Sequence, residues 1–217
     1  MVDELILVRH GETVHNVAGV AQGWNDSDLS DRGKRQVQRL AERIALMEID
    51  AIFSSSLQRA LTTAQAISDL TSLPLQAADD LREMSYGKWE GCSFLEVRRD
   101  HESAYRRWAS DSSAPCPGGE SHDDVRTRIE NFLSRIHVIS SAGAAPQGHG
   151  SNGDSLPRRP LIVAHGTAIR IAATVLLGLP VSTASRFAQD NASINVFVRR
   201  GERFVLKVWN DTTHCGD

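Results

Sequence analysis

The sequence predicts a three-layer α/β/α sandwich with a mostly parallel sheet, and two observations favour this fold class. Short apolar runs such as 5–8 and 161–164, typical of strands buried on both faces, alternate with amphipathic segments of helical period. Strands that alternate with helices form parallel sheets covered on both faces. The 217 residues suffice for one sizeable core, so we expect a single domain over residues 1–217.

The first half of the chain supplies two strands and two helices of this pattern. After the strand at 5–8, a polar, glycine-bearing segment leads to Ser30, a favourable N-cap for a helix. The apolar positions of that helix recur at helical spacing and are Val37, Leu40, Ala41, Ile44 and Met47. A short strand at 51–53 and a second helix over 57–70 follow.

The second half is irregular at first and then returns to the pattern. In residues 79–119 the sequence pattern predicts short helical pieces and a turn rich in proline and glycine. The elements expected after them are a helix with an apolar stripe from Val125 to Ile136, a strand at 161–164, a helix over 168–177 and a hairpin of 192–199 with 203–209.

Residues 140–160 differ from the rest of the chain in composition. They are rich in glycine, serine and proline and show no periodicity. Such a segment can link two domains. We expect a flexible insertion instead, because the part of the chain beyond it has too few elements to build a core of its own.

Composition and charge exclude several classes of protein. The net charge of −3 lacks the basic excess of nucleic-acid-binding proteins, so we expect no nucleic-acid partner. The acidic N-terminus does not resemble a signal peptide, and the apolar run at 5–8 is too short to cross a bilayer. Three widely spaced cysteines, Cys92, Cys116 and Cys215, fit reduced thiols. Together these features predict a cytoplasmic protein with no membrane partner.

The sequence also lacks the usual metal-binding patterns. It has no His-Glu-x-x-His motif and no pair of closely spaced cysteines. Asp26, Asp28 and Asp31 resemble the start of a calcium loop, but Val37 stands at the twelfth position, where glutamate binds the ion. We therefore expect no metal site and no cofactor.

The most informative feature is a repeated strand–histidine–glycine pattern. The run at 5–8 leads into Arg9, His10 and a glycine, and the run at 161–164 leads into His165 and a glycine. In open α/β sheets the ligand crevice lies at the carboxyl ends of the strands. We expect the two imidazoles to face each other across one pocket, where the glycines let backbone N–H groups approach an anion.

Several motifs, in this order, resemble the histidine phosphatase superfamily, whose members have the phosphoglycerate mutase-like fold. The motifs, which extend over nearly the whole chain, are Arg9-His10-Gly11-Glu12-Thr13, the serine-rich turn and arginine of 54–60, Leu81-Arg82-Glu83, Pro117-Gly118-Gly119-Glu120-Ser121, His165-Gly166 and Asn210-Asp211-Thr212-Thr213-His214. Around residues 83–91 the sequence is similar to the small bacterial phosphatases of this superfamily.

The resemblance implies a metal-independent phosphatase with three catalytic residues. His10 would attack phosphorus and form a phosphohistidine that water then cleaves. His165 would stabilise the charge that develops on the phosphoryl oxygens. Glu83 would protonate the departing oxygen and then deprotonate the attacking water.

The resemblance also implies a set of substrate-binding residues, which are Arg9, Asn16, Gln22, Gly23, Arg59, Tyr86 and Gly166. Arg9 and Arg59 would hold phosphate oxygens through charge-assisted hydrogen bonds. Asn16 would add a further donor. Tyr86 belongs to residues 79–119, which we expect to form a lid over the organic part of the substrate.

Two alternative functions remain open. The same fold serves phosphoglycerate mutases, but these usually have arginine after the acid and asparagine after the second His-Gly, where this chain has Met84 and Thr167. A non-catalytic module that binds phosphorylated ligands is the second alternative. It is disfavoured because His10 and the phosphate-holding arginines are retained.

The expected partner is a small phosphorylated metabolite, and a homodimer is compatible with the sequence. Phosphoserine, alpha-ribazole phosphate and a broad range of monoesters are all candidate substrates. The metal-independent phosphoserine phosphatases carry histidine where this chain has Tyr86. The substrate, the pathway and the oligomeric state are therefore left open by the sequence.

Overall fold

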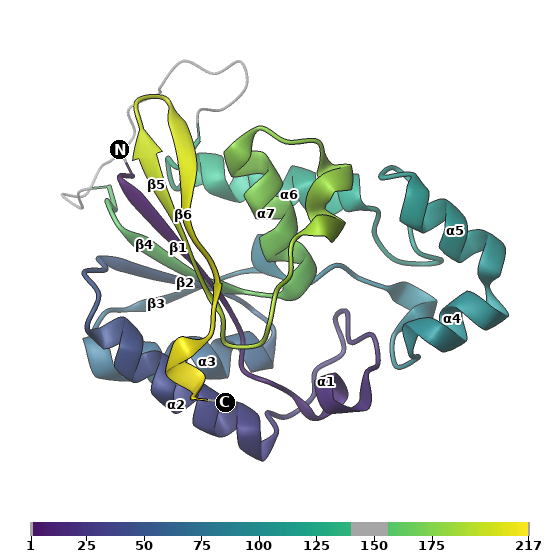
Figure 1. Cartoon of the computed structure of the whole chain (residues 1–217), viewed down its shortest axis with the longest axis horizontal. Helices are drawn as coiled ribbons and strands as arrows, with labels where there is room; N and C mark the ends of the chain where they lie inside the picture. The colour runs from purple at the N-terminus through teal and green to yellow at the C-terminus, as the bar shows by residue number, and fades with distance from the viewer. Residues whose placement is uncertain (1, 140–155, 217) are drawn as a thin grey trace.

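A computed structural model describes residues 2–139 and 156–216 and has a six-stranded sheet between layers of helices (Figure 1). The strands lie in the order β3-β2-β4-β1-β5-β6. Their bounds are Glu4–Arg9 for β1, Ala51–Ser55 for β2, Leu75–Ala78 for β3, Pro160–Ala164 for β4, Ile194–Arg200 for β5 and Arg203–Asp211 for β6. The predicted fold class is confirmed.

The sheet is parallel except at one edge. Strands β3, β2, β4 and β1 run parallel, with Val8 of β1 opposite Val163 of β4. Strand β5 is antiparallel to β1 and forms the predicted hairpin with β6. The carboxyl ends of β1, β2 and β4 therefore lie together at one end of the sheet, which is where ligands bind in open α/β folds.

Two long helices cover each face of the sheet (Figure 1). Helices α2 and α3 lie on one face and α6 and α7 on the other, with bounds Asp31–Ala45, Gln58–Thr71, His122–Arg135 and Gly166–Leu177. As predicted, Ser30 caps α2, and its hydroxyl accepts a hydrogen bond of 2.9 Å from the Gly33 N–H. No helix within the described ranges is long and apolar enough to cross a membrane.

The alternation of side chains along β1 explains why both faces are covered. Leu5 and Leu7 are buried with the apolar side chains of α6 and α7, whereas Ile6 and Val8 are buried with those of α2 and α3. Each such side chain contributes about 1.5–3 kcal/mol through its removal from water. The strand is thus fixed from both sides, and the residues that follow it are held in place.

Residues 79–119 form the short helical pieces that the sequence predicts. They contain α4 (Phe94–Asp100) and α5 (Glu102–Ser110), which lie to one side of the sheet (Figure 1). The structure adds α1 (Val14–Ala18) and β3, which the sequence pattern did not predict because both are too short to show a period. The flexible insertion expected at 140–160 lies outside the described residues, apart from 156–160.

Candidate active site

Two imidazoles meet where β1 and β4 end. Arg9 is opposite Ala164 in the register of these parallel strands, so the next residues, His10 and His165, leave the sheet side by side. Their ring centroids are 5.1 Å apart and the rings are inclined by 58°. Both side chains are buried. The structure thus brings together the two histidines that the repeated pattern singles out.

The ring of His10 is held in one orientation. Its Nδ1 lies 2.7 Å from the carbonyl oxygen of Gly11. Because a carbonyl oxygen only accepts hydrogen bonds, Nδ1 carries the proton and Nε2 holds the lone pair. Gly11 is itself fixed, since its N–H donates to Thr63 Oγ1 at 3.2 Å. This tautomer leaves Nε2 of His10 as a nucleophile.

The ring of His165 is held by a serine from the neighbouring strand. Nε2 of His165 lies 2.7 Å from the Ser55 hydroxyl, which also accepts a hydrogen bond from the Leu57 N–H. The hydroxyl proton has no other acceptor among the described residues, so it is donated to Nε2. Nδ1 of His165 then carries the ring proton, and it is buried without a partner in the described part of the chain.

Both histidines are neutral at neutral pH. Burial lowers the pKa of His10 and of His165 well below 6.5. The positive charges of Arg59 and Arg9 add to this effect. Two uncharged imidazoles therefore lie near two guanidinium groups, an arrangement in which one ring can attack and the other can donate a hydrogen bond.

Arg59 enters the site from the first turn of α3 with a buried side chain. Its Nη2 donates to the Gly23 carbonyl at 2.7 Å. Its Nη1 donates to the Asn25 carbonyl at 3.0 Å and to Asp26 Oδ1 at 2.9 Å. These bonds fix the guanidinium, while Nε is buried without a partner in the described ranges. Of its five N–H groups, that of Nε and one of Nη2 thus remain for a ligand.

Arg9 approaches from the end of β1. Its Nη1 donates to the Gln189 carbonyl, and its Nε is a second buried nitrogen for which no described residue is a partner. Burial lowers the pKa of Arg9 to about 10, so the guanidinium stays charged at neutral pH. A Cβ at Gly166 would lie 3.7 Å from this guanidinium, so Arg9 lies against the first turn of α7.

Asn16 and Gln22 face the site with fixed amide groups. Oδ1 of Asn16 accepts hydrogen bonds from the Thr13 N–H at 3.1 Å and from Asn191 Nδ2 at 3.0 Å. Oε1 of Gln22 accepts from the Thr13 hydroxyl at 3.0 Å. With both oxygen atoms occupied, the amide nitrogens of Asn16 and Gln22 remain as donors.

The carboxyl group of Glu83 is held at the N-terminus of α7. Oε2 accepts a hydrogen bond from the Thr167 N–H at 3.1 Å. Oε1 accepts from the Ala168 N–H at 3.3 Å and from the Met84 N–H at 2.8 Å. The carboxyl group therefore lies beside Gly166, 3.8 Å from where a Cβ of that residue would be, and faces the same space as Arg9.

The main chain of Glu83 is held by two side chains that no motif marks. Arg128 of α6 donates to the Glu83 carbonyl at 3.0 Å and to the Arg82 carbonyl at 2.7 Å. Its Nε pairs with Glu120 Oε1 at 2.9 Å. The indole N–H of Trp24 also donates to the Glu83 carbonyl, at 2.8 Å. Arg128 thus joins α6 to the segment that carries the acid.

Tyr86 joins residues 79–119 to α7. Its hydroxyl lies 2.9 Å from the Thr167 hydroxyl, and its ring packs edge-on against Phe94 at 5.4 Å. Burial raises the pKa of Tyr86 well above its ordinary value, so the phenol stays neutral. Tyr86 and Phe94 thus form an aromatic wall of the cavity that His10 and Glu83 also line.

These groups enclose one cavity of about 170 Å³. The residues that line it are Arg9, His10, Asn16, Val20, Ala21, Gln22, Gly23, Arg59, Glu83, Tyr86, Phe94, Gly166, Thr167 and Arg170. All the sequence-predicted site residues are in this list except His165, whose ring centroid is 5.1 Å from that of His10. Arg170 was not predicted, although it follows Gly166 by four residues and so shares its face of α7.

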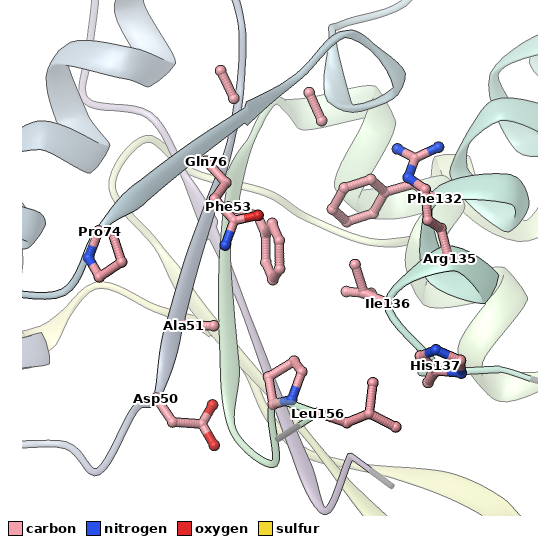
Figure 2. Close-up of a pocket in the computed structure, with 13 residues that line it drawn as sticks. Asp50, Ala51, Phe53, Pro74, Gln76, Phe132, Arg135, Ile136, His137 and Leu156 are labelled. Atoms are coloured by element: carbon pink, nitrogen blue, oxygen red, sulfur yellow. The ribbon is translucent and has the colours of Figure 1, made fainter. Parts of the chain in front are cut away.

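A larger hollow of about 660 Å³ lies elsewhere, between strands β2 and β3 and the C-terminal end of α6 (Figure 2). Phe53, Phe132 and Ile136 point into it, and Asp50 lies at its edge (Figure 2). It contains none of the predicted site residues. Within the described ranges no group of His, Cys, Asp and Glu side chains could hold a metal ion. The cavity lined by His10 is therefore the candidate active site.

Known proteins resemble the chain over nearly its whole length. The sequence model of the histidine phosphatase superfamily (branch 1) matches residues 5–212. Phosphoserine phosphatase 1 of Hydrogenobacter thermophilus is 32% identical over 99% of this chain and 95% of its own length. Glucosyl-3-phosphoglycerate phosphatase of Mycolicibacterium vanbaalenii is 37% identical over 83% of this chain and 76% of its own length.

Solved structures agree with these relatives. The crystal structure of the alpha-ribazole phosphatase from Shigella flexneri has a TM-score of 0.81 and 26% sequence identity, and the match covers 96% of each chain. The resemblance seen in the sequence motifs is confirmed. The chain belongs to the histidine phosphatase superfamily and is an enzyme of its phosphatase type.

Proposed function

We propose that this enzyme hydrolyses small phosphate monoesters without a metal ion, through a phosphohistidine on His10 and with Glu83 as acid and base. The observation that carries the proposal is the state of the His10 ring. The ring is neutral, and its Nδ1 donates a hydrogen bond to the Gly11 carbonyl. The lone pair of Nε2 therefore stays available to attack a substrate in the cavity. Arg9 and Arg59 beside it attract the phosphate dianion.

The phosphate would be bound by donors that lack partners within the described chain. These are Nε of Arg9, Nε of Arg59 and Nδ1 of His165. The amide nitrogen of Asn16 and the N–H of Gly166, in the first turn of α7, would complete the set. Two guanidinium groups supply the charge neutralisation that a metal ion would otherwise give, so the reaction proceeds in the presence of a chelator.

The reaction would take place in two steps. In the first, Nε2 of His10 forms a bond to phosphorus, the P–O bond to the alcohol breaks, and the departing oxygen takes a proton from Glu83. In the second, Glu83 removes a proton from water, whose oxygen attacks phosphorus and breaks the N–P bond. His165 donates a hydrogen bond to a phosphoryl oxygen in both steps.

The size of the cavity and the names of the relatives support a small phosphorylated metabolite as substrate. The cavity volume of about 170 Å³ is small for a ligand site. The relatives are named for phosphoserine, glucosyl-3-phosphoglycerate and alpha-ribazole phosphate. Residues 79–119 would act as the lid, since Tyr86 and Phe94 form the wall of the cavity that faces the organic part of the substrate.

A panel of phosphate monoesters with EDTA tests the proposal. We expect inorganic phosphate to be released by the wild type and not by a folded His10→Ala variant. Incubation with 3-phosphoglycerate and its bisphosphate primer should give no 2-phosphoglycerate, because Met84 and Thr167 replace the residues usual in mutases. Activity that disappears on chelation would contradict the proposal.

Rapid quenching tests the intermediate itself. A substrate labelled on phosphorus should leave label on the wild-type protein that is lost in acid and stable in alkali, as expected for phosphohistidine. The His10→Ala variant should carry none. Hydrolysis at an ordinary rate with no transient label would show that water attacks phosphorus directly.

Leaving groups of different basicity test the role of Glu83. The Glu83→Gln variant should lose about 10²–10⁴-fold in kcat with an alkyl phosphate, whose alkoxide needs a proton. With p-nitrophenyl phosphate the loss in the first step should be much smaller, because the phenolate leaves unprotonated. The comparison is made on kcat/KM, which reports on the first step alone, because kcat also contains the second step, in which Glu83 acts as the base with either substrate. Equal losses in kcat/KM with both substrates would assign Glu83 a structural role.

A further inference from the structure

The cavity contains a third guanidinium group that the proposed reaction does not use. Arg170 lies on α7, one helical turn after Gly166, and lines the cavity together with Thr167, Tyr86 and Phe94. Its side chain is half-buried. It comes from the helix whose first turn holds the acid, so its position is fixed relative to the reacting groups.

Arg170 has no partner in the described part of the protein. Its Nε is buried without a hydrogen-bond acceptor, and no described residue forms an ion pair with it. The arginines with a buried, unpartnered Nε in the described ranges are Arg9, Arg59 and Arg170, and all three line this one cavity. A buried charged donor without a partner costs about 1–3 kcal/mol or more, so such a cluster is expected where a ligand supplies the acceptors.

Arg170 lines the same cavity as Arg9 and Arg59 and comes from the helix that carries Thr167. The charges that lower the pKa of His10 are those of Arg59 and Arg9. The charge of Arg170 acts instead on the pKa of Arg9 and of Tyr86. Arg170 is therefore near Arg9 and lines the cavity together with Tyr86 and Thr167, and the organic part of a substrate bound to His10 would lie beside this wall.

We propose that Arg170 binds a carboxylate on the organic part of the substrate, so that the preferred substrates are phosphate esters of small hydroxy acids. The inference rests on the proposed phosphatase function. A carboxylate matches the planar fork of a guanidinium, and the small cavity places it only a few bonds from the phosphorus. The hydroxyls of Tyr86 and Thr167 provide further hydrogen-bonding groups beside it.

Matched substrate pairs test this inference. Phosphoserine carries a carboxylate that phosphoethanolamine lacks. In the second pair, 3-phosphoglycerate has a carboxylate where glycerol 3-phosphate has a hydroxymethyl group. We expect the wild type to prefer the carboxylated member of each pair by about 10-fold or more in kcat/KM, because a hydrogen bond to a charged group is worth about 1.5–3 kcal/mol.

The Arg170→Met variant should remove this preference. It should lose about 10- to 100-fold in kcat/KM on the carboxylated esters, mainly through KM, and less than about threefold on their partners. The Arg170→Lys variant keeps the positive charge but not the planar fork, so its preference for the carboxylated esters should lie between those of the wild type and Arg170→Met. As a control, Arg186→Met removes an exposed arginine outside the cavity and should leave both members of each pair unchanged.

The possible failures are distinguishable. If the wild type releases phosphate from neither member of any pair, the proposed function fails and this inference with it. If it hydrolyses both members but shows no preference, only the role of Arg170 is wrong. Equal losses on both members in Arg170→Met would mean that Arg170 holds the phosphate or the fold, which also overturns the inference. If that variant does not fold, the wild-type preference and Arg170→Lys decide.

Discussion

The hydroxyl of Ser55 lies 2.7 Å from Nε2 of His165 and accepts a hydrogen bond from the Leu57 N–H, and from these two contacts we assign the tautomer of the imidazole. Because the hydroxyl proton is donated to Nε2, the ring proton is on Nδ1. We propose that His165 stabilises the transition state through this Nδ1–H, so the tautomer matters for the rate. Ser55 is in this sense a positioning residue, since it acts on the substrate only through His165.

Replacing Ser55 by alanine should therefore slow the reaction. We expect kcat/KM to fall about 5- to 100-fold, because a buried hydrogen bond is lost and Nε2 is left unpaired. In ¹⁵N NMR spectra the His165 ring should change from the Nδ1–H tautomer to a mixture. Ser54→Ala is the control, since it removes an equally buried hydroxyl on β2 that bonds to the Ser55 carbonyl and not to the histidine. An unchanged ring spectrum in Ser55→Ala would refute the tautomer assignment.

The buried histidines predict a loss of stability in acid. The pKa of His10 and of His165 is lowered in the folded protein, so the unfolded chain takes up protons first as the pH falls below 6.5. The free energy of unfolding should then decrease by up to about 1.4 kcal/mol per pH unit for each histidine. This stability is fully present above pH 6.5. Urea unfolding between pH 7.5 and pH 5 measures the slope.

The pH slope should be smaller when these rings are removed. In a His10→Asn, His165→Gln double variant, the slope of the free energy of unfolding against pH should decrease by an amount that corresponds to up to about two protons. A residual slope is expected from His122 and His214, because burial also lowers the pKa of each. If wild type and double variant have the same slope below pH 6.5, the two histidines are not buried in their neutral form.

The pH dependence of catalysis should follow the same groups. The nucleophile must be neutral, and the pKa of His10 in the free enzyme is lowered by burial and by Arg59 and Arg9. The acidic limb of kcat/KM should therefore lie below pH 6.5 once the ionisation of the substrate is taken into account. Initial rates with an aryl phosphate between pH 4 and pH 8 provide the profile. A limb at or above pH 6.5 would mean that His10 titrates like an exposed histidine.

Arg128 is expected to affect both stability and catalysis. It donates to the carbonyls of Asp80, Arg82 and Glu83 and pairs with Glu120, so its loss leaves several acceptors unpaired. Arg128→Met should reduce the free energy of unfolding by about 2–4 kcal/mol. It should also lower kcat for alkyl phosphates, since the main chain of Glu83, the proposed acid, loses one of the two side chains that hold it.

A matched variant on the same helix gives the comparison for Arg128. Arg126→Met breaks only the more exposed pair with Glu130 and should cost about 0–1 kcal/mol. Chemical denaturation of the two variants measures the difference. Equal effects in both would show that the contacts of Arg128 contribute little.

Gly33 of α2 packs closely against the main chain of Glu12, and the helical pattern of α2 does not reveal this contact. A Cβ there would lie 1.9 Å from the carbonyl oxygen of Glu12, which belongs to the motif around His10. Gly33→Ala should therefore destabilise the protein by about 1–3 kcal/mol, even though alanine favours helices. Arg35→Ala, at an exposed position of the same helix, should change stability by less than about 0.5 kcal/mol. A more stable Gly33→Ala protein would mean that the loop moves away at little cost.

The sequence by itself determined the fold class and most of the cavity wall. Apolar runs, helical stripes and an N-cap at Ser30 are local patterns, and they predicted the main strands and helices because burial on two faces requires them. The motif around His10 and the acid at Glu83 are also local, and the structure places both at one cavity. The short elements α1 and β3 were missed because they have no period of their own.

Only the tertiary structure decided how these groups are held and what surrounds them. The tautomer that we assign to His165 depends on Ser55, which is 110 residues away in the chain. The main chain of Glu83 is held by Arg128 of helix α6. Arg170 looks in the sequence like any polar residue on a helix. Its missing partner becomes visible only when the cavity is formed, because a hydrogen bond depends on the distance in space between donor and acceptor and not on their separation in sequence.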